Sequence, residues 1–345
     1  MLLREYLKQF TKEELLLRAK IFGLKGYSGL NKAVLINHIV TSLCEEGLIR
    51  GRLACLTKEQ IAFFRKACNI PQNLSLERAD DILQLYKGML GFVDDATSRF
   101  CVFEEVAEAY KNFDDEKFKT EQFKKGWMVK CLRFFRQFYG IAPLEVIYKL
   151  YKLKVKDSMD EMMDILYEMP LNVIEANIYD MEELGFIDWP THDPLYSYEG
   201  LILDFSLSDD EDLDDLLKEQ MAKDFYIPSA QQIEEIYKIG YEQSIMAYKR
   251  LEKFFVKNLH MTYEMAYAFC LAVWAKNYEG ISPVKLIDKM AEHNIVFDND
   301  NQLKEFVELI MDAHNNTRLI ENRGHTPIEM KKNTGRYTCN KQDVY

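Results

Sequence analysis

Signals for the start of a helix recur along the whole chain. In a capping box, a Ser or Thr and a Glu or Gln three residues later satisfy two backbone N–H groups that the first helical turn leaves free. The pattern occurs at Thr11–Glu14, Thr57–Gln60 and Ser229–Gln232, each ahead of apolar residues at helical spacing. The sequence therefore predicts a mainly α fold with several helical domains.

Chain length and cysteines limit the kind of protein further. A chain of 345 residues is long enough for about two to four domains. Its seven cysteines include no C-x-x-C pair, which favours reduced thiols over a disulfide framework. The N-terminal MLLREYLKQF lacks the apolar core of a signal peptide, and the longest apolar run, 265–275, is too short to cross a bilayer. We therefore expect a cytoplasmic protein with no membrane partner.

The charge is unevenly distributed. The whole chain has a formal net charge of −12, but residues 1–52 hold nine Lys or Arg against five Glu. Residues 123–156 hold nine Lys or Arg against one Glu. Because Lys and Arg neutralise phosphates and release their counterions, two basic segments in an acidic chain indicate two places where a polyanion can bind.

The first basic segment has a recognisable layout. A helix after Thr11 is interrupted by FGLKGYSG, and a second helix follows with Leu35, Ile39 and Leu43 on one face. The stretch LREYLKQFTKEELLLRAKIFGLKGYSGLNKAVLINHIV resembles the helix-extended-helix module at the N-terminus of the transcription terminator Rho, which is similar to the SAP module. The resemblance implies a module over residues 1–48 that binds nucleic acid or packs beside a domain that does. The alternative is a two-helix packing unit with no ligand.

Two later segments share a helix followed by Leu-Gly-Phe. GMLGFVDD at 88–95 recurs as EELGFIDW at 182–189, and an extended aromatic segment follows each, RFCVF and LYSYEGLIL. A helix that ends ahead of a strand–turn–strand is the layout of a winged helix. The sequence therefore predicts two winged-helix-like units with short β-hairpins, at 53–118 and 119–205. A coincidental repeat is the alternative.

The basic residues of these modules are the candidate nucleic-acid contacts. In FKKGWMVKCLRFFRQFYGIAPLEVIYKLYKLKVKD, Lys and Arg are interleaved with aromatic residues that can stack on bases. The candidates from both basic segments are Lys20, Lys25, Lys32, Lys124, Lys125, Lys130, Arg133, Arg136, Lys149 and Lys152. The alternative is that the lysines form a solvated face and the aromatic residues form a core. The pattern does not distinguish DNA from RNA.

An acidic segment separates these units from the rest of the chain. DFSLSDDEDLDD at 204–215 lacks the Gly and the Glu that a calcium-binding EF-hand loop requires. We expect an acidic linker at 206–225, which can also compete with nucleic acid for the basic residues. Amphipathic segments then predict a helical domain at 226–333, followed by a tail at 334–345.

The polar stretch NNTRLIENRGHTPIEM at 315–330 is typical of a loop followed by a capped helix. Its TPIE supplies a Thr N-cap, a Pro at the first helical position and a Glu at the third, so a last helix should start at Thr326. The stretch also resembles the NNTR…GHTP segment of bacterial proteins that end in a SEC-C zinc knuckle. Here the tail has only Cys339, which with His314 and His325 leaves too few ligands for a zinc site. We therefore predict no metal and no cofactor.

No catalytic motif is recognisable in the sequence. It has no P-loop, GxGxxG after a strand, HExxH or GxSxG, and the group Asp188, His192 and Asp193 lies beside prolines that favour a turn. We expect a non-enzymatic protein that binds nucleic acid, or regulates through such binding, with phosphate contacts from its basic modules. The alternative is a phage or mobile-element factor that binds or inhibits a host protein, with an acidic surface that mimics nucleic acid. An enzyme is the weakest alternative.

Overall fold

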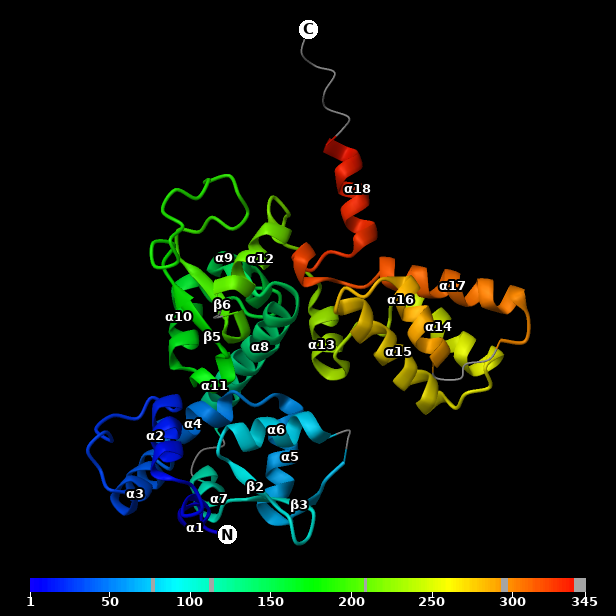
Figure 1. Cartoon of the computed structure of the whole chain (residues 1–345). Helices are drawn as coiled ribbons and strands as arrows, with labels where there is room; N and C mark the ends of the chain where they lie inside the picture. The colour runs from blue at the N-terminus through cyan, green and yellow to red at the C-terminus, as the bar shows by residue number, and fades with distance from the viewer. Residues whose placement is uncertain (76–77, 112–114, 208–209, 293–296, 338–345) are drawn as a thin grey trace. The chain divides into compact units, whose positions relative to one another are not determined.

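The computed structural model describes residues 1–75, 78–111, 115–207, 210–292 and 297–337. This part of the protein is mainly α-helical and contains two small three-stranded sheets, which confirms the predicted fold class (Figure 1). Backbone contacts divide the chain into two compact units. The first combines Met1–Leu132 with Lys154–Asn177, and the second combines Arg133–Leu153 with Ile178–Tyr345.

The first unit holds the N-terminal helices. They are α1 (Leu3–Leu7), α2 (Lys12–Ile21), α3 (Lys32–Leu43), α4 (Glu46–Ala54), α5 (Lys58–Asn69), α6 (Ala79–Lys87) and α7 (Glu104–Tyr110), with α10 (Met159–Glu168) and α11 (Leu171–Ile174) added from later in the chain. The long helix α8 (Glu116–Phe138) begins in this unit and ends in the second. Thr11 and Thr57 form the predicted capping boxes of α2 and α5.

One apolar core runs through the first unit. It joins side chains from α1, α2 and α3 with those of α5, α6 and the first sheet. The buried Arg52 donates from Nη1 to Gly88 O at 2.6 Å and from Nη2 to Leu43 O, which ties α3 to the end of α6. The predicted segments 1–48 and 53–118 therefore share one core, because their apolar faces pack on each other.

The first sheet has the predicted helix-then-hairpin layout. Its antiparallel strands β1 (Gln72–Asn73), β2 (Gly91–Asp94) and β3 (Arg99–Val102) lie in the order β1-β3-β2. The motif GMLGFVDD leads from the end of α6 into β2. Assignment of this segment to the winged-helix class stays a prediction, as does the resemblance of residues 1–48 to the Rho module.

The second sheet has the same strand order with different connections. Its strands β4 (Ile141–Pro143), β5 (Ala176–Tyr179) and β6 (Leu201–Asp204) lie in the order β4-β6-β5. The predicted equivalence of the second Leu-Gly-Phe, at 184–186, is wrong: the motif follows β5 and lies in the β5–β6 connection. Pro170 precedes the one-turn helix α11, and Glu175 ends it with a positive φ, so the chain becomes extended before it reaches the motif.

The acidic segment differs from the linker expected at 206–225. Residues Asp210–Gln220 form α12, in which Leu217 and Gln220 are buried. Gln220 Nε2 donates a hydrogen bond to Tyr139 O at 2.8 Å. The segment folds onto the second unit because leucines recur at helical spacing among its carboxylates and give the helix an apolar face.

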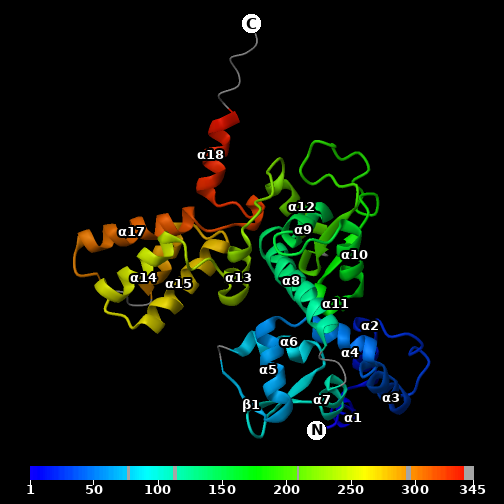
Figure 2. The same cartoon turned by 180° about the vertical axis from the view of Figure 1, so that it is seen from behind.

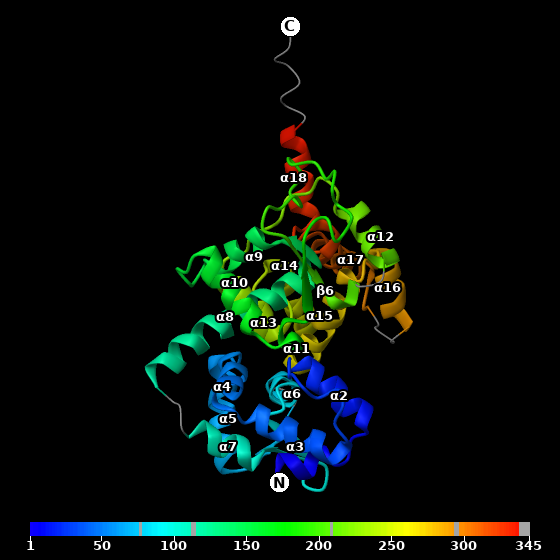
Figure 3. The same ribbon diagram turned by 90° about the vertical axis from the view of Figure 1, so that its left-hand side faces the viewer.

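The other regular elements of the second unit are helices. They are α9 (Leu144–Tyr151), α13 (Ala230–Ile239), α14 (Met246–Asn258), α15 (Tyr263–Tyr278), α16 (Pro283–Glu292), α17 (Asp300–Asn315) and α18 (Pro327–Tyr337), with short 3-10 turns η2 (Phe205–Leu207) and η3 (Ile320–Asn322). Helix α14 packs against α15 and α17 (Figure 2), and α16 packs against α17 (Figure 3). Ser229 forms the predicted capping box of α13. Within the described ranges, every helix is too short or too polar to traverse a lipid bilayer.

Candidate functional site

The candidate lysines at the start of the second basic segment are ion-paired inside the first unit. Lys124 Nζ lies 2.7 Å from Asp157 Oδ2. Lys125 is only 2% exposed, and its Nζ lies 2.9 Å from Glu121 Oε1 and 3.0 Å from Glu168 Oε2. Burial opposes the charge of Lys125, but the two carboxylates outweigh it and raise the pKa of the ammonium. A phosphate would have to displace these carboxylates to reach either lysine.

The other candidates of this segment differ in their surroundings. Arg136 Nε lies 3.1 Å from Asp204 Oδ2, so a carboxylate neutralises it as well. The Arg133 guanidinium lies 5.2 Å from the centre of the Tyr237 ring, within range of a cation–π contact. The remaining candidates are the half-buried Lys130 and the exposed Lys149 and Lys152.

Four aromatic residues of the same segment form core, whereas Phe123 is 51% exposed. Phe134, Phe135, Phe138 and Tyr139 are each no more than 1% exposed. Base stacking needs an accessible ring face, so these four rings cannot serve a nucleic acid in this conformation. For them the core alternative is correct, and the interleaved pattern reflects a helix with a buried face.

The three N-terminal candidates are exposed and border a single connection. Lys20 lies in the last turn of α2, Lys25 lies in the α2–α3 connection, and Lys32 opens α3. Gly23 and Gly26 both have positive φ in this connection, a conformation that glycine adopts without strain. These lysines therefore remain accessible to a polyanion.

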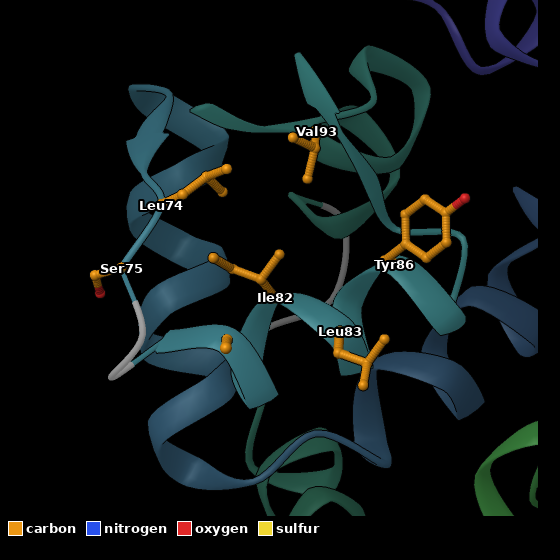
Figure 4. A pocket seen from close by; sticks show the side chains of 7 residues that line it. Leu74, Ser75, Ile82, Leu83, Tyr86 and Val93 are labelled. Atoms are coloured by element: carbon orange, nitrogen blue, oxygen red, sulfur yellow. The ribbon is translucent and has the colours of Figure 1, made fainter. Parts of the chain in front are cut away.

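An apolar groove that the sequence pattern does not predict lies on the first unit (Figure 4). It has a volume of about 570 Å³ and is lined by Leu74, Ser75, Ala79, Ile82, Leu83, Tyr86 and Val93. Leu85 anchors α6 in the core, while Leu83 and Tyr86 remain 45% and 41% exposed. The signal in the sequence is the run ILQLY, which gives α6 apolar residues on more than one face.

Two cationic side chains beside the groove pair with neighbouring carboxylates. Arg78 Nη1 donates to Asp81 Oδ2 at 2.9 Å, and Lys87 forms an ion pair with Glu175. Tyr86 accepts a hydrogen bond from another tyrosine hydroxyl at 3.2 Å, which orients its ring at one side of the groove. The groove therefore suits apolar side chains rather than phosphate groups.

Among the described residues, no three His, Cys, Asp or Glu side chains are grouped so that they could hold a metal ion. Burial raises the pKa of the Cys55 and Cys270 thiols to about 12 and that of Cys68 to about 11, so these thiols stay protonated at neutral pH. In DWPTHD, His192 is exposed and Asp193 accepts a hydrogen bond from a loop N–H at 2.8 Å. Asp193 therefore shapes a turn.

The polar stretch at 315–330 forms the predicted loop and capped helix. Glu329 Oε2 accepts a hydrogen bond from Thr326 N at 2.9 Å, and Thr326 Oγ1 accepts one from Glu329 N at 3.3 Å. Helix α17 ends at Asn315 and α18 begins at Pro327, which confirms this prediction.

Arg318 organises this stretch from inside the second unit. Its Nε donates to Glu242 Oε2 at 2.6 Å, and its Nη1 donates to Glu329 Oε2 at 3.0 Å. The guanidinium also lies 3.5 Å from the centre of the Tyr226 ring. Burial alone would raise the pKa of Glu329, but His325, Arg318 and the helix cap outweigh it and lower the pKa to about 2. Arg318, Thr326 and Glu329 satisfy one another's polar groups and act as a packing element. Arg323 Nε and His325 Nε2 are buried without a hydrogen-bond partner among the described residues.

Comparisons with known proteins do not identify the chain. No family model, no curated protein and no solved structure matches it. A functional conclusion therefore depends on the surfaces described above.

Proposed function

We propose that the protein is a non-enzymatic binding factor whose first unit docks an apolar segment of another protein. The supporting observation is the groove beside α6, where Leu83 and Tyr86 stay accessible and the neighbouring Arg78 and Lys87 form ion pairs. Grooves of this kind receive the apolar face of a partner helix. A host protein bound by a phage or mobile-element factor would be one such partner. A cytoplasmic location belongs to the proposal and agrees with the free thiols of the six described cysteines.

Site-specific photo-crosslinking tests this proposal. A photoreactive amino acid is placed at Leu83 in the groove or, as a matched control, at Leu17, which is 57% exposed on α2 of the same unit. We expect a discrete crosslinked protein from the Leu83 position only, and we expect Tyr86→Asp to abolish it. Equal crosslinking from both positions, or crosslinking that survives Tyr86→Asp, contradicts the proposal. Circular dichroism confirms that the variants fold.

A second candidate function is nucleic-acid binding through the N-terminal lysines. Its support is the exposure of Lys20, Lys25 and Lys32 around one connection, together with the resemblance of this segment to the Rho module. The α8 side chains contribute less to this proposal, because Lys124, Lys125 and Arg136 already have carboxylate partners. The expected contacts are to phosphates, without base reading.

Gel shifts with single-stranded RNA and DNA across a salt series test the second candidate. The variant Lys20→Glu/Lys25→Glu is compared with Lys149→Glu/Lys152→Glu, which reverses two exposed lysines of the second unit. We expect the N-terminal variant to bind about tenfold more weakly and to show a shallower salt dependence, since fewer counterions are released. Unchanged binding by the N-terminal variant, or an equal loss in both variants, contradicts it.

A further inference from the structure

The connection between β5 and β6 is a long loop with internal order. Within residues 180–200, Phe186 N donates to Met181 O at 2.7 Å, and Trp189 N donates to Phe186 O at 3.1 Å. Its inner side chains, including those of Met181, Phe186 and Trp189, pack on the core formed by β4, β6 and α12. The Phe186 and Trp189 rings lie 4.7 Å apart. The loop is therefore organised before any partner arrives.

Two charged residues from outside the loop support its second half. Glu145 of α9 accepts hydrogen bonds from Ser197 Oγ at 2.6 Å and from Tyr198 N at 3.2 Å. The fully buried Arg323 has its Nη2 3.9 Å from Asp193 Oδ1. These contacts hold Asp193, which lies between the two prolines, and residues 197–198, which follow them, so the second half of the loop has a defined position.

The exposed side chains of the loop are apolar and acidic. Ile187 is 73% exposed and Tyr198 is 83% exposed, although Met181, Phe186 and Trp189 of the same loop pack inward. Exposed carboxylates accompany them at Asp180, Glu182, Glu183, Asp188 and Glu199. The sequence from 180 to 199 contains no Lys or Arg, so no residue of the loop balances this charge.

We propose that the exposed side chains of the β5–β6 loop dock a cationic segment of another protein, one that combines Lys or Arg with apolar side chains. Charge complementarity selects this partner: a polyanion would be repelled by the carboxylates, and a purely apolar segment would leave them unmatched. Ile187 and Tyr198 would supply the apolar contacts, because tyrosine gives a large contact area at a low entropic cost. The site lies in the second unit and is independent of the groove in the first.

Binding of a labelled amphipathic Lys/Leu peptide to the full chain tests this inference. The comparison probe is the same peptide with every Lys replaced by Glu. We expect saturable binding of the cationic probe only, weaker at high salt, with hydrogen-exchange protection at residues 180–199. The variant Ile187→Ser/Tyr198→Ser should bind about tenfold more weakly, as expected when two central contacts are removed.

Control variants of the second unit distinguish binding at the loop from a general attraction of the cationic peptide to an acidic protein. Val284→Ser/Tyr263→Ser removes two side chains that are 68% and 75% exposed elsewhere in the unit. Asp212→Asn/Asp214→Asn removes two exposed carboxylates of α12, to be compared with Asp188→Asn/Glu199→Gln in the loop. The inference is supported if the control variants bind the cationic peptide within about twofold of the wild type while the loop variants lose affinity. It is overturned if the cationic peptide does not bind, if the Glu peptide binds equally well, or if the control variants lose as much affinity as the loop variants.

Discussion

The two sheets share a strand order but are closed in different ways. The β2–β3 turn is short, and its own Asp94 holds it by accepting hydrogen bonds from Ala96 N at 3.1 Å and Thr97 Oγ1 at 2.8 Å. The β5–β6 loop depends on Glu145 and Arg323, which are distant in sequence. Near the short turn, the accessible apolar side chains belong to α6, whereas the long loop itself exposes Ile187 and Tyr198. A mutation at a local contact should therefore destabilise only the neighbouring residues. A mutation at a long-range contact should destabilise several elements.

Removing Arg318 gives the largest expected effect and tests the long-range half of the comparison. In Arg318→Met, the buried Glu242 loses the cation that neutralises it and keeps the Gln232 amide as a donor, and we expect the free energy of unfolding of the second unit to fall by about 3–5 kcal/mol. Hydrogen exchange should become faster around α18 and the segment that contains Glu242, with little change at β2 and β3.

Two further variants check the cause. Arg318→Met/Glu242→Leu removes both charges and should recover much of the loss, because an apolar pair can replace a buried ion pair. Arg52→Met in the first unit leaves only backbone carbonyls unpaired and should cost about 1–3 kcal/mol. If Arg318→Met accelerates exchange equally at β2 and β3, the distinction between the two units is wrong.

The same division between local and distant contacts explains what the sequence could predict. The capping boxes at Thr11 and Thr57 and the loop before Thr326 involve neighbours in the chain, so residue types alone indicate them. Arg318 and Glu242 are 76 positions apart, and only the fold brings them together.

The candidate sites show the same limit. The basic pattern around α8 predicted cations correctly but not their carboxylate partners. Lys125 pairs with Glu121 of the same helix and with Glu168 of α10, and Lys124 pairs with Asp157. The groove was missed because helical spacing identifies the buried face of α6, while the exposure of Leu83 depends on what packs nearby. The prediction that a helix leads into the second Leu-Gly-Phe is wrong because Glu175, with φ near +50°, ends the helix that the sequence pattern would continue.

Glycine substitutions compare packing in the short hairpin with backbone strain in the long loop. A Cβ on Gly91 of β2 would lie 2.4 Å from Cys101 O and 2.5 Å from Phe100 Cζ, so Gly91→Ala should destabilise the first unit by about 1–3 kcal/mol. Gly185, in the β5–β6 loop, has φ +75° and open space around it, so Gly185→Ala should cost only about 1 kcal/mol. Urea unfolding measures both changes. A larger loss from Gly185→Ala would show that loop conformation matters more than hairpin packing.

Acid titration tests Glu329, the carboxylate that pairs with Arg318 and caps α18. The pKa of Glu329 is lowered to about 2 in the fold, so its stabilisation is fully present above the unfolded pKa, near 4.5, and is lost as the pH falls towards 2. Because the side chain is 33% exposed, we expect about 1–2 kcal/mol rather than the full value of the shift. The unfolding free energies of wild type and Glu329→Gln should therefore converge as the pH falls. A constant difference from neutral pH down to about pH 2.5 would exclude this role.

The smallest expected losses of stability come from removing Glu145, which holds the β5–β6 loop, and Asp94, which holds the β2–β3 turn. Glu145→Ala removes the acceptor for Ser197 and Tyr198 and should cost about 1 kcal/mol, since both of these hydrogen bonds hold the loop to α9. Asp94→Ala removes two hydrogen bonds inside an exposed turn and should cost about 0.5 kcal/mol. Limited proteolysis sharpens the contrast, because Glu145→Ala should expose residues 195–200 to cleavage while Asp94→Ala leaves the short turn resistant. Equal cleavage of both connections would mean that anchoring distance does not govern their order, and the loop would then owe its shape to the inward packing of Phe186 and Trp189.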